Sequence, residues 1–136
     1  MINGGGTKPS TEIKYPQDGD PVLVTDLNYV KLFLSDVKSV ETRSSTSKKK
    51  RSTVIYLSGV ETFHIQGYAY FDGSIKVENQ KQWDELYHRH RVDKFGGPKG
   101  KWKHGWCLYH PHTYENPIEN LNRKGQTWRP FMGKKI

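Results

Sequence analysis

Residues 60–73 read VETFHIQGYAYFDG, and from residue 63 to residue 71 apolar or small residues alternate with His, Gln and Tyr. Successive side chains of a β-strand point to opposite faces, so the alternation predicts one strand with two different faces. The first face holds the odd-numbered positions: Phe63, Ile65, Gly67, Ala69 and Phe71. Gly67 inside the strand indicates a bulge or a close backbone approach. Asp72-Gly73 predicts a turn, followed by a further short strand, SIKVE.

The segments on either side of this strand predict more strands and two short helices. Strands are expected in the segments 21–26, 38–43, 53–57, 104–110 and 127–131. A short helix is favoured over 29–35, with Asn28 as its cap. A second helix is predicted over 79–91, capped by Asn79, because apolar side chains recur there at helical spacing. The predicted fold class is α+β, a small β-barrel with two or three short helices.

Length and composition limit the class of protein. The 136 residues predict an arm over 1–20, which is rich in Gly and Pro, and one domain over 21–136. A single cysteine, Cys107, excludes an intramolecular disulfide and any multi-cysteine zinc site. No apolar run approaches the ~20 residues of a membrane span, and no signal peptide is visible. These features predict a protein that is not secreted and makes no membrane contact, in the cytoplasm or associated with the nucleoid or nucleus.

Positive charge is unevenly distributed along the chain, which carries a net charge of +8. Residues 41–51 hold five basic side chains and one acidic, residues 88–104 hold six and one, and residues 119–136 hold five and one. Such segregation indicates a positive face that binds a polyanion such as nucleic acid. An acidic partner protein remains a weaker alternative.

Two segments resemble ASCH domains, small members of the PUA-like β-barrel superfamily. In SDVKSVETR (35–43), Lys38, Ser39, Val40, Glu41 and Arg43 fit the signature of that family, whereas Asp36 and Val37 replace its glycine. In HGWCLYHPHTYENPIENLNRKGQTW (104–128), the matching positions are Gly105, Trp106, Pro111, Pro117, Ile118, Lys124, Gly125 and Trp128. The resemblance implies a cleft between barrel and helices that binds RNA or a modified nucleobase.

The segment 38–43 also supplies the candidate site. Glu41 and Arg43 share one face of the expected strand, and Lys38 lies opposite them or in the preceding turn. Arg43 would bind a phosphate or a base edge, and Glu41 would accept from a base amino group. Lys38 and Arg43 are expected to line one pocket, with Glu41 within reach. A plain ion pair with a solvated lysine is the alternative.

An enzyme on nucleotide substrates is the alternative function. By resemblance to amidohydrolases of acylated cytidine, the catalytic residues would be Lys38, Glu41 and Glu85, although those enzymes carry Thr where this chain has Glu41. A ribonuclease would use a histidine as general acid or base, and the candidates are His88, His90 and His104. Neither a metal nor a cofactor is expected.

Basic and aromatic side chains complete the predicted nucleic-acid interface. Lysines neutralise phosphates and aromatic faces stack on unpaired bases, which favours RNA over DNA in this class of fold. The predicted binding residues are Lys38, Arg43, Lys48, Lys49, Lys50, Arg51, Lys99, Lys101, Trp102, Lys103, Arg123 and Lys124. Trp106 is expected in the core instead.

Overall fold

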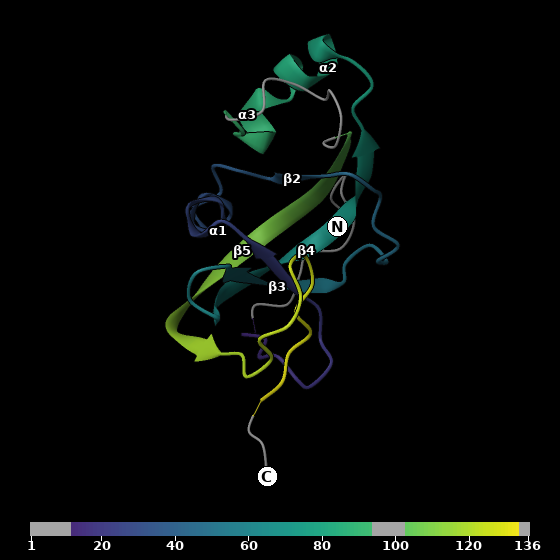
Figure 1. The fold of residues 1–136 in the computed structure, drawn as a ribbon. Helices are drawn as coiled ribbons and strands as arrows, with labels where there is room; N and C mark the ends of the chain where they lie inside the picture. The colour runs from purple at the N-terminus through teal and green to yellow at the C-terminus, as the bar shows by residue number, and fades with distance from the viewer. Residues whose placement is uncertain (1–11, 94–102, 134–136) are drawn as a thin grey trace, which may run out of the picture.

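A computed structural model describes residues 12–93 and 103–133, which form an α+β fold with three short helices and five strands (Figure 1). The elements in chain order are β1 (Val22–Thr25), α1 (Leu27–Leu34), β2 (Val40–Arg43), β3 (Val54–Gly59), β4 (His64–Lys76), α2 (Gln80–Glu85), α3 (Tyr87–His90) and β5 (His104–Glu119). No helix in the described ranges is long and apolar enough to cross a membrane.

The five strands form one mixed sheet in the order β1-β3-β4-β5-β2, in which only β1 and β3 run parallel. β1 and β2 are its two edges, so the closed barrel expected from the sequence is not confirmed. The free edge of β1 instead bonds the C-terminal segment, since Val24 donates to the carbonyl of Thr127 and Arg129 donates to that of Val22. The strand expected over 127–131 is thereby reduced to a single bridge between Leu23 and Trp128.

β4 runs through the predicted turn at Asp72-Gly73 without reversing, so that prediction was wrong. Gly73 has a φ of +92° and lies in an irregular stretch of the β4–β5 pairing, between Phe71 and Ser74. A glycine at positive φ therefore makes a bulge here instead of a hairpin. The close approach expected at Gly67 is confirmed, because a Cβ at this position would lie 2.1 Å from the carbonyl oxygen of His112.

The helices begin and end close to where their sequences predict. Asp26, not Asn28, caps α1, and its side chain accepts from the backbone N–H of Asn28. Asn79 caps α2 as expected. The single helix predicted over 79–91 is divided at Leu86, and α3 ends where Arg91 takes a left-handed conformation with φ 55°.

Apolar side chains cover both faces of the sheet. α1 packs on one face through Val30 and Phe33, around a cluster that includes Trp106, which is in the core as expected. The opposite face carries a tyrosine-rich cluster, which the N-terminal segment joins: the backbone N–H of Lys14 donates to the Tyr68 hydroxyl, its carbonyl accepts from the Tyr114 hydroxyl, and Tyr15 stacks on Tyr114. The division into an arm over 1–20 and a domain over 21–136 stays a prediction.

Candidate functional site

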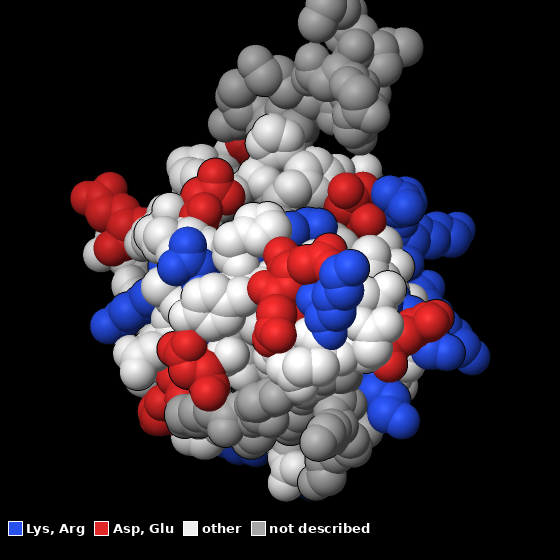
Figure 2. Space-filling model, turned by 90° about the horizontal axis from the view of Figure 1, so that it is seen from above, with Lys and Arg blue, Asp and Glu red and all other residues white. Residues whose placement is uncertain are grey.

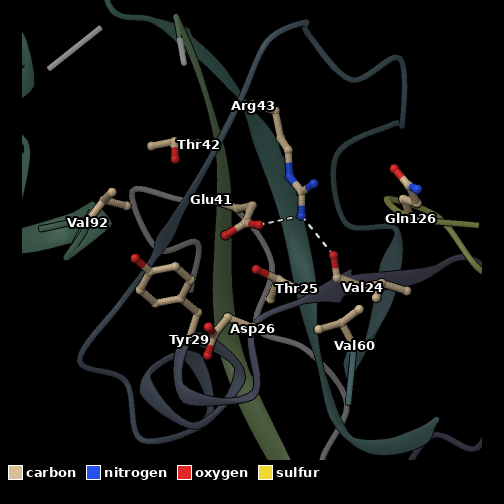
Figure 3. A pocket seen from close by; sticks show the side chains of 10 residues that line it. All are labelled: Val24, Thr25, Asp26, Tyr29, Glu41, Thr42, Arg43, Val60, Val92 and Gln126. Atoms are coloured by element: carbon tan, nitrogen blue, oxygen red, sulfur yellow. Dashed lines mark hydrogen bonds and ion pairs between the residues drawn. The ribbon is translucent and has the colours of Figure 1, made fainter. Parts of the chain in front are cut away.

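A pocket of about 290 Å³ lies at the seam between the edge strands β1 and β2 (Figure 3). We call it the seam pocket. Its lining residues are Val24, Thr25, Asp26, Tyr29, Glu41, Thr42, Arg43, Val60, Val92 and Gln126. The Glu41 carboxylate, the Thr25 side chain and the Tyr29 ring lie around the same space, and the Arg43 guanidinium lies beside it. Side chains thus occupy the place where backbone pairing would have closed a barrel.

Arg43 joins the two edges of the sheet. Its Nη2 donates to Glu41 Oε2 at 2.5 Å and to the carbonyl oxygen of Val24 at 2.9 Å, while Nη1 donates to Thr127 Oγ1 at 3.4 Å. The side chain keeps 16% of its surface exposed, and its buried Nε makes no hydrogen bond within the described residues. Arg43 is therefore both a wall of the pocket and the bridge that positions β2 against β1.

Lys38 lies directly behind the pocket and does not line it. Its side chain is fully buried, Nζ donates to the backbone carbonyl of His90, and Nζ lies 3.8 Å from Glu41 Oε1. The rings of Tyr29 and Phe33 are 4.6 and 5.2 Å from Nζ. Desolvation lowers the pKa of Lys38 to about 8, and the nearby Glu41 carboxylate only partly opposes this shift.

Glu41 is 4% exposed and accepts from Arg43 on one side while facing Lys38 on the other. The structure thus brings together the three charged residues of the segment 38–43. The placement of Lys38 comes from the turn between α1 and β2, where its backbone N–H donates to the carbonyl of Leu32. This turn directs the lysine inward, to the same side as Glu41.

His90 is held by the backbone and is unsuited to acid–base catalysis. Its Nε2 lies 2.9 Å from the carbonyl oxygen of Trp83, and its Nδ1 accepts from the N–H of Val92 at 2.9 Å. Burial lowers the pKa of His90, which favours this neutral form. His88 is exposed on α3, and His104 is partly buried on β5 with its Nδ1 unbonded within the described residues. None of the three lines the seam pocket.

The pKa of Lys38 predicts how stability depends on pH. In the unfolded chain the ammonium titrates near 10.5, so between about pH 8 and 10.5 the unfolded state binds more protons and the free energy of unfolding rises with pH. Between pH 7.5 and pH 9.5, the free energy of unfolding of wild type, measured by urea denaturation, should rise by about 1–2 kcal/mol more than that of Lys38→Met. Tyrosine and cysteine titration is common to both proteins and cancels. Parallel pH profiles would mean that buried Lys38 stays charged.

The other predicted binding residues are scattered over the described surface. Lys48, Lys49, Lys50 and Arg51 are exposed between β2 and β3, and Arg51 pairs with Asp72. Lys103 and Lys124 are exposed, and Arg123 pairs with Glu119. Glu85 is exposed on α2 and does not line the seam pocket. Lys99, Lys101 and Trp102 lie outside the described residues.

Charge on the face seen from above is mixed (Figure 2). Acidic and basic side chains lie next to each other near its centre, and basic side chains are densest along its right margin. This face is therefore not uniformly positive. No group of three or more metal-ligating side chains occurs within residues 12–93 and 103–133.

Several pocket residues were not predicted from the sequence. Thr25, Asp26 and Tyr29 come from β1 and the first turn of α1, and Gln126 comes from the C-terminal segment. A local sequence signal for Tyr29 exists in Asp26, because this capping residue fixes where α1 begins and hence where Tyr29 lies. Gln126 carries no local signal, since only the pairing of the C-terminal segment with β1 brings it to the seam.

Comparison with known proteins supports one fold. No protein-family model matches the sequence, and no curated protein matches it. Among solved structures, the ASCH protein from Zymomonas mobilis is similar with a TM-score of 0.62 and 18% identity, covering 77% of this chain and 76% of that one. A Ser-to-Ala mutant of the same protein gives a TM-score of 0.63 and 16% identity, covering 80% and 79%. The chain has the fold of an ASCH domain, as the sequence resemblance implied.

Proposed function

We propose that this ASCH-fold domain binds single-stranded nucleic acid, RNA in preference to DNA, by taking one base into the seam pocket. The observation that carries the proposal is the pocket itself: about 290 Å³ enclosed by an aromatic ring, a buried carboxylate and a partly exposed guanidinium. This volume is near the lower end of small-molecule pockets, about 300–1,000 Å³. It suits one planar base.

The polar groups of the pocket match the edge of a base. Oε1 of Glu41 accepts no hydrogen bond within the described residues, because Arg43 bonds Oε2 and Lys38 Nζ lies 3.8 Å from Oε1, at ion-pair distance only. Such an oxygen accepts from a base amino group, and the guanidinium donates to a ring nitrogen or carbonyl. Tyr29 supplies an aromatic face, on which an unpaired base stacks.

Phosphates would lie outside the seam pocket. Asp26 and Glu41 line it together with Arg43, so the cavity is not strongly positive. The exposed basic run at Lys48–Arg51 follows β2 along the chain and is suited to the backbone of the same strand. We infer that the seam pocket contacts the base, whereas the basic side chains of residues 48–51 contact the phosphates.

The burial of Lys38 favours a binding protein over an enzyme. The lowered pKa would suit a lysine nucleophile. However, Nζ is fully buried, donates to the carbonyl of His90 and lies under Tyr29 and Phe33. Of the other two residues expected for a hydrolase, Glu41 lines the pocket, whereas Glu85 is exposed on α2 and does not line it. We therefore assign Lys38 to positioning Glu41.

A salt titration tests the proposal. Single-stranded RNA, single-stranded DNA of the same sequence and duplex RNA are titrated against the protein by fluorescence anisotropy. Binding should be tightest for single-stranded RNA, with a log–log salt slope of about −2 to −3, because three or four neutralised phosphates each contribute about −0.7. A flat salt dependence, or no binding at low salt, would reject the function. Equal affinity for duplex would reject base capture.

A further inference from the structure

We propose that a second cleft, the Trp128 cleft, holds the neighbouring nucleotide of the same strand, with its phosphodiester on lysine and its base on tryptophan. This inference rests on the proposed function. The cleft has a volume of about 440 Å³, and its lining residues are Ser45, Thr46, Ser47, Lys48, Lys49, Trp106, Thr127 and Trp128. Two lysines and four hydroxyl side chains line it without any acidic residue, so the cleft complements an anion.

A tryptophan pair supports the cleft. Trp106 and Trp128 stack with their ring centroids 5.5 Å apart and their planes 15° from parallel. Trp106 is buried, and its indole N–H donates to the carbonyl of Ser45, which anchors the rim of the cleft to the core. Trp128 is only partly buried. An aromatic ring held rigidly at a basic surface is the arrangement on which single-stranded bases stack.

Lys49 connects the ring to a phosphate site. Its Nζ lies 5.0 Å from the centre of the Trp128 ring, and the side chain is otherwise exposed. The exposed ammonium has a flexible four-carbon stem, so it can turn from the ring to a phosphate oxygen when a base arrives. The hydroxyl groups of Ser45 and Thr46 at the same rim offer further donors.

Arg43 makes the two cavities neighbours. It lines the seam pocket, its guanidinium lies 5.7 Å from the Trp106 ring, and it donates to Thr127 in the Trp128 cleft. Gln126 lines the seam pocket and the next residue, Thr127, lines the Trp128 cleft. A strand whose base enters the seam pocket therefore passes over Arg43 and reaches Trp128 with the adjoining nucleotide. The preferred ligand is then an oligonucleotide and not a free nucleotide.

Ligand length and two variants test this assignment. A nucleoside monophosphate and a single-stranded RNA tetranucleotide are titrated by calorimetry against wild type, Trp128→Ala and Lys49→Gln. We expect Trp128→Ala to weaken tetranucleotide binding about 5- to 150-fold, the range that loss of one base stack produces. Lys49→Gln should reduce the salt slope by about 0.7. Monophosphate affinity should be the same in all three proteins.

Matched controls separate binding from folding. Tyr87→Ala removes an exposed aromatic ring and Lys76→Gln an exposed charge, both outside the two cavities, and neither should change affinity. Trp128→Phe keeps an aromatic face and should retain most of the tetranucleotide affinity, in case Trp128→Ala fails to fold.

The outcomes distinguish the two proposals. If the tetranucleotide binds no better than the monophosphate, and Lys49→Gln and a folded Trp128→Ala match wild type, the Trp128 cleft is overturned while the seam pocket stands. If Arg43→Ala leaves monophosphate binding unchanged, the seam pocket is overturned instead. If wild type binds neither ligand, both proposals fail.

Discussion

Arg43→Ala is expected to weaken single-stranded RNA binding by a factor of roughly 30 to 5,000. Removing one member of a desolvated, hydrogen-bonded charge pair costs about 2–5 kcal/mol. Arg43 donates to Glu41, to the Val24 carbonyl and to Thr127, so alanine removes a pocket wall and also the bridge between β1 and β2. Anisotropy titration of the variant against wild type, at one salt concentration, measures the loss.

Two companion variants identify the reason for the loss. Arg43→Lys keeps the charge but lacks the planar guanidinium that reaches three acceptors, so it should bind with intermediate affinity. Lys81→Ala removes one exposed basic side chain on α2, outside the seam pocket, and should behave as wild type. A folded Arg43→Ala protein, judged by circular dichroism, that binds with wild-type affinity would contradict the proposed site.

Glu41→Ala is expected to lower the free energy of unfolding by about 3–5 kcal/mol, because it removes the carboxylate that accepts from Arg43 and faces buried Lys38. Glu41 itself is 4% exposed, so its carboxylate is largely shielded from water in the folded protein. Urea denaturation at pH 7 measures the loss. In Glu41→Gln the amide oxygen can still accept from Arg43, so this variant should lose less of the free energy of unfolding.

The same experiment carries its own controls. Asp72→Ala breaks the exposed pair with Arg51 and should change stability by less than about 1 kcal/mol. Adding Lys38→Met to Glu41→Ala removes the stranded charge and should recover part of the lost stability. If Glu41→Ala is no worse than Asp72→Ala, the cluster at Lys38, Glu41 and Arg43 is hydrated and the account of the site is wrong.

Most strands of the fold were predictable, because alternating and β-branched patterns are local. The strand beginning at residue 64, the close approach at Gly67 and the Asn79 cap followed from their own neighbours. The prediction of a turn at Asp72-Gly73 was wrong, because the same dipeptide fits a bulge when the partner strand continues past it. β5 does continue, through to Glu119, and no residue within β4 specifies that.

The sequence by itself determined which residues gather at the site: Lys38, Glu41 and Arg43 stand within six positions at the entry and along one strand. Tertiary structure decided their environment. The C-terminal segment takes the free edge of β1, and therefore the seam is left to side chains and becomes a pocket. It also placed Trp128 beside Trp106, 22 positions away in the sequence. The periodicity of a strand indicates which of its faces is buried. The pairing of an edge strand depends instead on a segment distant in the chain, and this contact leaves no pattern in the sequence of the strand or of that segment.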